Sequence, residues 1–343
     1  MEKELSCQLK ERLKDLDAGQ CLLRIYSYPA KTVQEKLFPL GDFKDTKLLL
    51  EHYDLYPGMG ITFAWCLGHK FAFHHSHKPS VLKIDHCNLG RIGWNMENGQ
   101  SLYVGKGDLA VHCRDACKES RTEITFPLGY YEGITVSIDL DVLKTTLPSP
   151  LNETELPEGL LFHKFCTSQE IFSFPANKRV EHIFSELYHL PQEMKFPYLK
   201  LKCQELLLFL YMEDPSQGKA ADPYYSDQVE IIRSVHSLLT QNLTKRFTIE
   251  ELSKKYLINS SALKSIFKSV YGLPIASYMK EYRIQQAAAM LRCSQESISS
   301  IALSVGYESP SKFTNAFKSV TGILPTDYRK QYQGENHRKE TRI

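Results

Sequence analysis

Two short segments near the C-terminal end of the chain have the apolar period of helices with one buried face. Their remaining positions, on the opposite helix face, carry serine, lysine and asparagine side chains. Such side chains donate hydrogen bonds to the base edges and phosphate oxygens of DNA, so the pattern favours a nucleic-acid interface. The outward-facing residues are Ser261, Lys264, Ser265 and Lys268 in the first segment and Ser311, Thr314, Asn315 and Lys318 in the second, with Lys312 at the margin.

The two segments belong to an internal repeat. Residues 267–272 recur as residues 317–322, with five of six residues identical at an offset of fifty, and Tyr278 is matched by Tyr328. A solvated helix face is the alternative explanation for either polar segment alone. The duplication weakens that alternative, because chance does not easily produce two such faces fifty residues apart. The repeat predicts two similar supersecondary units on one chain.

Each unit is predicted to be a helix, a tight turn and a second helix. In the first unit, Thr248 and Glu251 have the spacing of a capping box at the start of the first helix. Residues 257–259 form the predicted turn, and Ser260 is expected to cap the second helix, which ends at Gly272. Its predicted buried residues are Leu263, Ile266, Phe267 and Val270.

The second unit repeats this plan. Ser297 is the expected cap of its first helix, and Gly306 begins the turn. Ser309 and Pro310 follow in the order that favours a helix start, and Gly322 ends the helix. Its predicted buried residues are Phe313, Ala316, Phe317 and Val320. Between the units, residues 275–291 predict a helix of about 17 residues, roughly 25 Å long, which could hold the two second helices about one DNA turn, near 34 Å, apart.

The charge is distributed unevenly along the chain. Residues 226–343 hold 17 lysines and arginines against 10 aspartates and glutamates, whereas residues 1–225 hold 25 against 30. A basic C-terminal module suits a partner made of phosphates, since neutralising phosphates supplies much of the affinity for nucleic acid. Charge alone is a weak signal, because many solvated helical domains carry as much.

The N-terminal 150 residues have the pattern of short strands. Alternating runs separated by glycine-rich turns favour a barrel or sandwich, and Asn98-Gly99 between two such runs predicts a hairpin. From about Asn177 the period becomes helical, with an apolar stripe that favours either a core-facing or a dimer-forming helix. The stripe consists of Leu199, Cys203, Leu206, Leu207 and Leu210. We expect a strand-rich sensing domain at 1–150, a helical region at 151–212, a linker at 213–226 and a DNA-binding domain at 227–332.

Other chemistry has little support in the sequence. A histidine-rich stretch, which includes His69, His74, His75, His77, His86 and Cys87, could hold a metal in a barrel. Strand alternation, however, places His74 on the opposite face from His75 and His77, so we expect no metal site. No Gly-x-Ser-x-Gly motif or phosphate-binding loop is present, so we expect neither catalysis nor a cofactor. An interaction scaffold without DNA binding does not explain the duplicated, capped helix pairs.

The nine cysteines show no disulfide or zinc spacing, and we expect reduced, partly buried thiols. The N-terminus has no apolar segment like that of a signal peptide, and no stretch approaches the length of a membrane span. The expected compartment is therefore the cytoplasm.

Residues 226–332 resemble the DNA-binding domain of the AraC/XylS family of bacterial transcription regulators. The resemblance rests on Ile301-Ala302, Gly306-Tyr307-Glu308-Ser309, Phe313, Phe317-Lys318, Thr321-Gly322, Pro325 and Tyr328-Arg329, and on Leu263, Phe267-Lys268, Gly272, Pro274, Tyr278 and Arg283-Ile284 in the first unit. The first unit departs from the family pattern at Ser253, where alanine is usual. This departure affects only the local packing.

The resemblance implies a sequence-specific regulator that reads double-stranded DNA through Ser261, Lys264 and Ser265 and through Ser311, Lys312 and Asn315. It also implies an N-terminal domain, similar to the cupin-like domains of the family, that senses a small molecule or mediates dimerisation. The expected fold class is multidomain α+β, with a cupin-like N-terminal β-barrel, a helical dimerisation segment and an all-α double helix-turn-helix domain. A second copy of the chain and RNA polymerase are further expected partners.

Overall fold

The computed structural model describes residues 8–27, 32–74, 80–95, 99–113, 121–153, 159–167, 171–214, 219–220 and 224–340. The chain forms two compact units, Met1–Ser226 and Asp227–Ile343, and each is described by itself below. Within the described residues, no helix combines the length and the apolar character that a membrane span requires.

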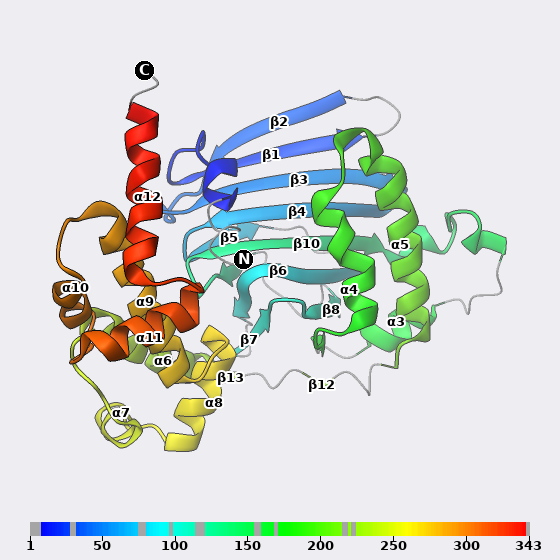
Figure 1. The fold of residues 1–343 in the computed structure, drawn as a ribbon. Coiled ribbons are helices and arrows are strands. Elements are labelled where there is room, and N and C mark those ends of the chain that lie inside the picture. Colours follow the sequence, from blue (N-terminus) through cyan, green and yellow to red (C-terminus); the bar gives the residue numbers. More distant parts are fainter. Residues whose placement is uncertain are drawn as a thin grey trace. The chain divides into compact units, whose positions relative to one another are not determined.

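The N-terminal unit is built on antiparallel strands, with one parallel pair between β1 and β3 (Figure 1). The main ladder runs in the order β12-β11-β8-β6-β10-β4-β3-β1-β2. The strands are β1 (Gln20–Ser27), β2 (Thr32–Pro39), β3 (Lys47–Tyr56), β4 (Met59–Leu67), β5 (Lys70–His74), β6 (Val81–Asn95), β7 (Gln100–Gly105), β8 (Leu109–Cys113), β9 (Arg121–Thr125), β10 (Tyr130–Asp139), β11 (Phe172–Phe174), β12 (Lys219–Ala220) and β13 (Tyr224–Tyr225).

Strand β6 is long enough to belong to two ladders. Its first half pairs with β8 and β10, and its second half pairs with β7 and β9. The β6–β7 pairing confirms the predicted hairpin, in which Trp94 lies opposite Leu102. Gly99 has φ +74°, as this turn requires, whereas Asn98 lies outside the described residues. Sharing β6 gives the unit two β layers with side chains between them.

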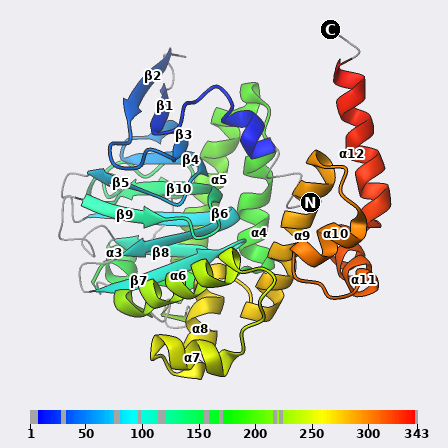
Figure 2. The same ribbon diagram turned by 90° about the vertical axis from the view of Figure 1, so that its left-hand side faces the viewer.

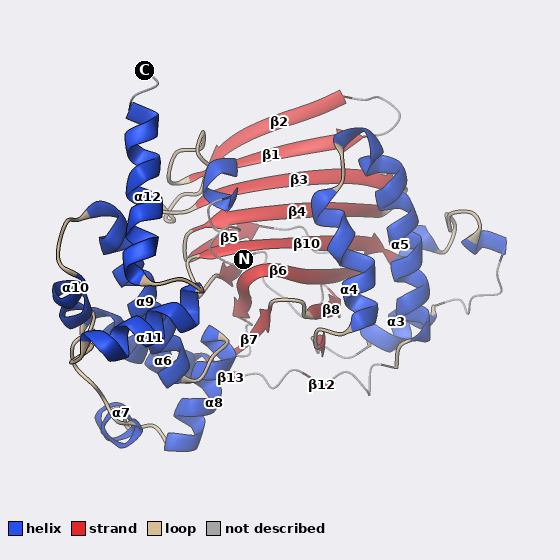
Figure 3. Cartoon of the chain, in the orientation of Figure 1, coloured by secondary structure: helices blue, strands red, loops and turns tan. Residues whose placement is uncertain are grey.

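Helices cover the opposite face of the main ladder (Figure 3). They are α2 (Leu140–Leu143), α3 (Leu160–Phe165), α4 (Lys178–Phe184) and α5 (Lys195–Met212), with 3₁₀ turns η2 (Leu151–Glu153), η3 (Ser185–His189) and η4 (Gln192–Met194). The apolar stripe around Leu206 is buried among these elements and the strands. The stripe therefore faces the core, and the proposal that it forms a dimer contact is wrong.

Two further features of this unit differ from the expectations. Residues 213–226, expected as a linker, contribute β12, which pairs with β11, and β13, which pairs with β7. Cys113 and Cys166 form a disulfide across a sequence separation of 53 residues, with Cα atoms 5.0 Å apart. The expectation of reduced thiols is wrong for this pair, because folding brings together cysteines that show no paired spacing in the sequence.

The C-terminal unit is all helical, which confirms the expected fold class (Figure 2). Its helices are α6 (Ser226–Gln241), α7 (Ile249–Tyr256), α8 (Ser260–Tyr271), α9 (Ile275–Cys293), α10 (Ile298–Ser304), α11 (Pro310–Thr321) and α12 (Pro325–Glu340). Helices α10 and α11 pack with α9 and Tyr328 around one apolar core. The pairs α7–α8 and α10–α11 are the two predicted helix-turn-helix units.

Candidate nucleic-acid interface

The start of the first unit is fixed by reciprocal capping bonds. The Glu251 amide donates to Thr248 Oγ1 at 3.1 Å, and the Thr248 amide donates to Glu251 Oε2 at 2.8 Å. This confirms the capping box, which satisfies two amides that the first helical turn leaves without partners. The second cap is one residue earlier than expected: Asn259, not Ser260, accepts from the Ser261 amide at 2.7 Å. An asparagine in extended backbone is equally suited to that role.

Helix α8 separates its side chains into two faces as predicted. Its apolar residues Leu263, Ile266, Phe267 and Val270 are buried. Ser261, Lys264, Ser265 and Lys268 are exposed on the other face. The exposed set combines hydroxyl donors near the helix start with two lysines one turn apart, which is the composition that a major-groove helix uses.

Helix α11 repeats this arrangement. Ser297 caps the preceding helix by accepting from the Ser300 amide at 3.0 Å, as predicted. Ser309 occupies the cap position of α11 and Pro310 its first turn, although the Ser309 side chain makes no capping bond. Ser311, Lys312, Asn315 and Lys318 are exposed, whereas Thr314 is half-buried.

Both second helices end in the same way. Gly272 and Gly322 have φ of +85° and +82°, and each donates its amide to a lysine carbonyl four residues earlier at 2.8 Å. These carbonyls belong to Lys268 and Lys318, so both lysines lie in the last helical turn. Glycine is favoured here because a left-handed residue without Cβ carries no steric penalty.

Tyrosines from the helices that follow support the two second helices. Phe267 meets Tyr278, and Phe317 meets Tyr328, in edge-to-face ring contacts. The sequence repeat predicted these four positions, but it did not predict His236 of α6. This histidine stacks on Tyr271 with ring centroids 4.2 Å apart and hydrogen bonds the Tyr278 hydroxyl at 2.8 Å. No pattern within α6 marks His236 as part of this aromatic cluster.

The two turns use different residues for the same left-handed conformation. Gly306 has φ +86°, and a Cβ at this position would lie 2.2 Å from the carbonyl oxygen of Leu243. The corresponding residue of the first unit is Leu257, with φ +52° and a side chain that is 93% exposed. Between the units, α9 runs for 19 residues, about 28 Å at 1.5 Å per residue. This length is near the helical repeat of DNA, about 34 Å.

A second candidate site is a cavity of about 820 Å³ between the two β layers of the N-terminal unit. Polar side chains project from neighbouring strands on one wall, and aromatic and aliphatic side chains line most of the remainder. The polar residues on that wall are Thr62, Lys83, Asp85, His112, Thr135 and Ser137. Trp94 lies beside His112, with ring centroids 5.8 Å apart. Such a cavity matches the size and mixed lining of small-molecule sites.

Asp85 is at the centre of the polar wall. It accepts hydrogen bonds from His112 Nε2 at 2.8 Å and from the Thr135 hydroxyl. Burial acts to raise the pKa of Asp85, but the bond and charge of His112, the charge of Lys83 and the Thr135 bond together hold that pKa below its usual value. This site was not predicted from the sequence, although Lys83 and Asp85 alternate with apolar residues on one strand.

The histidine-rich stretch does not form a metal cluster in the described part of the chain. His86 is in the core, where its ring stacks on Phe184 at 4.4 Å and Nδ1 lies 2.9 Å from the Tyr188 hydroxyl. Burial lowers the pKa of His86 to about 4 and raises that of the Cys87 thiol above its usual value. The side chains of His74, His75 and His77 lie outside the described residues.

Comparison with known proteins identifies similarity in the C-terminal unit. Residues 252–331 match the family model of a helix-turn-helix domain. The chain is 27% identical over 128 residues to the transcriptional activator RhaR of Mannheimia succiniciproducens, covering 37% of this chain and 45% of that protein. It is 34% identical over 100 residues to a putative AraC-like transcription regulator of Streptomyces lividans, covering 29% of this chain and 33% of the relative. The chain therefore spans less than half the length of these relatives.

Among solved structures, ToxT of Vibrio cholerae O395 is 14% identical, covers 79% of this chain and 98% of its own, and has a TM-score of 0.31. The helices within residues 252–331 carry the capped turns, glycine stops and paired aromatic contacts described above. Residues 252–331 therefore form a helix-turn-helix domain of the AraC type.

Proposed function

We propose that the protein is a sequence-specific, DNA-binding transcription regulator that responds to a small molecule. The observation that carries the proposal is the repetition of one geometry: two helices, α8 and α11, that each end at a left-handed glycine and have a buried apolar face and an exposed polar and basic face. A single such face is common on soluble proteins. Two of them, joined by the 19-residue helix α9 on a basic unit, have the arrangement that reads successive major grooves.

The exposed side chains divide into two roles by their position on each helix. Ser261, Lys264 and Ser265 on α8, and Ser311, Lys312 and Asn315 on α11, lie in the first two turns, from which side chains reach base edges. Lys268 and Lys318 lie in the last turn, where they contact phosphates. Base contacts supply sequence preference, and phosphate contacts supply affinity for any duplex.

The cavity of the N-terminal unit is the proposed effector site. It is large enough for a small metabolite, and its wall around Asp85 offers both hydrogen-bond donors and acceptors. An effector that binds one conformation of the protein more tightly than another shifts the population toward it, which is what a ligand-responsive regulator requires. The protein acts in the cytoplasm on chromosomal DNA, with RNA polymerase as a partner, and has no enzymatic role.

We also propose that the protein acts as a homodimer through the outer face of α5. With the stripe around Leu206 buried, three other apolar side chains of this helix are exposed: Leu201 at 65%, Leu208 at 40% and Met212 at 68%. Leu201 and Leu208 are seven residues apart, the spacing that aligns side chains along one seam of paired helices. A second copy presents the same stripe, so a two-fold pairing covers both.

Selection of bound duplexes from a random pool tests the proposed function. The full-length protein should enrich one motif and bind it about 10³-fold or more tightly than a scrambled duplex at physiological salt. Asn315→Ala should reduce this ratio. Lys330→Ala, which removes an exposed charge from α12 rather than from a recognition helix, serves as the control and should preserve it. If the intact protein enriches no motif, the proposal is wrong.

A further inference from the structure

A pair of cysteines joins strand β8 to helix α3. Cys113, the last residue of β8, is joined to Cys166, the C-cap of α3. The residue before Cys113 is His112, which lines the cavity and forms a hydrogen bond with Asp85. Cys113 is buried, whereas Cys166 is partly exposed. Because successive side chains of a strand alternate, Cys113 points to the face of β8 opposite His112 and the cavity. The disulfide is therefore open to a reagent in solution on its Cys166 side.

The remaining cysteines in the described chain lack this combination. Cys21, Cys66, Cys87 and Cys203 are buried, and burial raises the pKa of each thiol above its usual value. Such thiols are poor nucleophiles because little thiolate forms. Cys293 is exposed, but it has no cysteine partner in the described residues. Cys113 and Cys166 thus form the pair suited to reversible chemistry.

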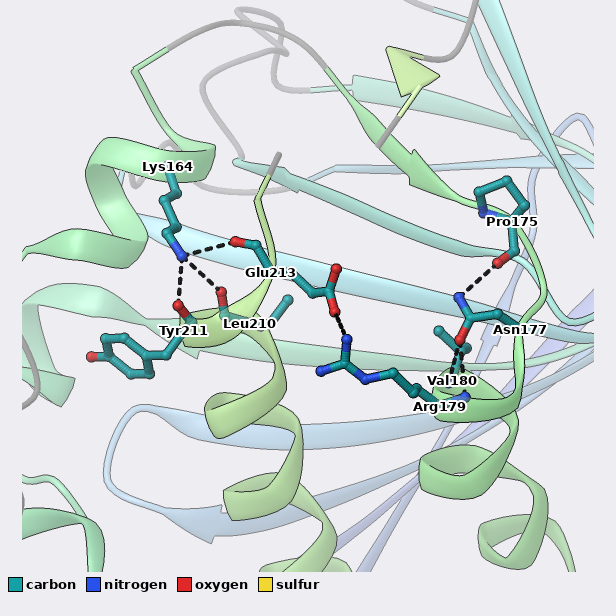
Figure 4. A network of polar contacts seen from close by, with 8 residues as sticks. All are labelled: Lys164, Pro175, Asn177, Arg179, Val180, Leu210, Tyr211 and Glu213. Atoms are coloured by element: carbon teal, nitrogen blue, oxygen red, sulfur yellow. Dashed lines mark hydrogen bonds and ion pairs between the residues drawn. The ribbon is translucent and has the colours of Figure 1, made fainter. Parts of the chain in front are cut away.

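Helix α3 connects this pair to the end of α5. The ammonium of Lys164, two residues before Cys166, donates to the carbonyl oxygens of Tyr211 at 2.6 Å and Glu213 at 2.8 Å, with a third contact to Leu210 at 3.5 Å (Figure 4). Lysine donors are well placed at a helix C-terminus, where backbone carbonyls lack partners. The last turn of α5 is therefore held by a side chain of α3.

Glu213 is held from a second side as well. Its carboxylate pairs with Arg179 of α4 (Figure 4). The Arg179 guanidinium also lies over the Phe209 ring. Glu213 is the C-cap of α5, and the segment leading to the C-terminal unit begins there. The position of α3 therefore helps to determine how firmly the first residues of that segment are fixed.

We propose that Cys113 and Cys166 form a thiol–disulfide exchange site whose co-reactant is a low-molecular-weight disulfide, and that its redox state controls DNA affinity through Lys164. This inference rests on the proposed function. A cytoplasmic disulfide is normally kept reduced, so one that folding forms in a regulator is suited to sensing a more oxidising state. The disulfide fastens the six-residue helix α3 to β8, and its reduction leaves α3 held by packing and hydrogen bonds alone.

The Cys166 thiol loses its proton to solvent, and its thiolate attacks one sulfur of the small disulfide, releasing one small thiolate. The Cys113 thiol then loses its proton and attacks the Cys166 sulfur of the mixed disulfide, releasing the second small thiolate. Two protein thiols are oxidised to one disulfide, and the small disulfide is reduced to two small thiols, which take up the two protons.

The oxidised protein should bind its operator more tightly. The segment from Glu213 to the C-terminal unit is held to the N-terminal unit by the two-residue pairings of β12 and β13. When its first residues are already fixed, this segment loses less conformational entropy on adopting one conformation in the DNA-bound protein. The expected difference is about fivefold in Kd, which corresponds to fixing roughly one backbone residue. The effect should require Lys164, because this side chain transmits the state of α3 to the end of α5.

The test equilibrates the full-length protein in buffers of varied oxidised-to-reduced glutathione ratio. Thiols are trapped by alkylation, and Kd is measured for the selected operator. We expect the Cys113 and Cys166 peptides to lose alkylation together as the ratio rises, with Kd falling about fivefold over the same range. Cys166→Ser and Cys113→Ala should remain at the reduced affinity throughout, and Cys293→Ser should titrate like the wild type.

Lys164→Met, which keeps the apolar stem and removes the donor, should leave the thiol titration intact and abolish its effect on Kd. Lys144→Met on α2 is the matched control and should retain the effect. If both cysteines stay alkylated at every ratio, the exchange site is wrong. If they pair while Kd stays within twofold in both states, the regulatory role is wrong. If the pair titrates but no duplex is preferred in either state, the exchange site is supported and the proposed function fails instead.

Discussion

Tyr278 stands edge-on to Phe267, with ring centroids 5.5 Å apart and an interplanar angle of 76°. Fifty residues later Tyr328 stands in the same relation to Phe317, at 5.3 Å and 81°. Both phenylalanines are fully buried. An edge-to-face ring pair has a defined geometry and a favourable energy beyond burial. Each pair therefore fixes the second helix of its unit, α8 or α11, against the helix that follows. The two units are packed in the same way.

Phe267→Ala and Phe317→Ala should each destabilise the C-terminal unit by about 3–5 kcal/mol, because each removes a fully buried aromatic ring. Chemical denaturation followed by far-ultraviolet circular dichroism measures the loss. Both tryptophans, Trp65 and Trp94, lie in the N-terminal unit, so the tryptophan fluorescence transition is an internal control and should not move. Losses below about 1 kcal/mol at both positions would contradict the burial of these rings.

Leu257→Gly should stabilise the first helix-turn-helix unit by about 1 kcal/mol. Leu257 holds a left-handed backbone with φ +52° while its side chain is almost fully exposed, so the change relieves strain and removes little packing. Gly306→Ala should do the reverse, because its Cβ would lie 2.2 Å from the Leu243 carbonyl oxygen. The same denaturation experiment measures both variants. A loss of stability in Leu257→Gly would show that the exposed leucine makes a contact of its own.

Lys264→Ala and Asn315→Ala should each cost about 1–3 kcal/mol on the selected operator and relax preference at one or two base pairs. Lys268→Ala and Lys318→Ala should weaken specific and scrambled duplexes alike and reduce the salt slope by about one unit, since each removes a phosphate contact. Titrations on both duplexes over a salt series separate the two classes. The assignment fails if Asn315→Ala weakens both duplexes equally while Lys318→Ala changes the sequence preference.

The N-terminal unit should lose stability as the pH falls from about 7 to 5. Because burial lowers the pKa of His86 to about 4, the unfolded state binds a proton in this range that the folded state does not, and protonation favours unfolding. The contribution of His86 is about 2 kcal/mol between these pH values. His86→Phe should flatten this slope, and His182→Gln, at an exposed histidine of α4, should not. Denaturation followed by tryptophan fluorescence at each pH gives the comparison.

Leu201→Glu and Leu208→Glu should each shift the protein from dimer to monomer in analytical ultracentrifugation, because a charge in an apolar seam is buried without a partner. Leu37→Glu on β2 replaces a leucine away from α5 whose exposed fraction, 58%, lies between those of Leu201 and Leu208, and it should leave the dimer intact. Binding to a single half-site should be unchanged in all three variants. A wild-type monomer at micromolar concentration, with operator present, would overturn the dimer proposal.

The fold of the C-terminal unit could be predicted from the sequence because its determinants are local. Each signal acts over only a few residues: the capping box at Thr248, the glycine that ends each second helix and the period of apolar residues. The glycine and the apolar period occur in both units because the sequence is repeated. The local signals were less precise where two neighbouring residues suit the same role. Asn259 rather than Ser260 caps α8 for that reason.

The N-terminal unit shows what the sequence alone could not determine. Alternation predicted strands and the β6–β7 hairpin, but strand order arises from pairings between distant residues, such as Val136 with Ile84 and Ile61. Those pairings place Asp85 beside His112 in a cavity and bring Cys113 within reach of Cys166, 53 residues away. The sequence likewise allowed two ways of burying the apolar stripe of α5: against a second copy of the chain or against the sheet of the same unit. Only tertiary packing decided between them, because the apolar period of a helix specifies which face is buried and not what covers it.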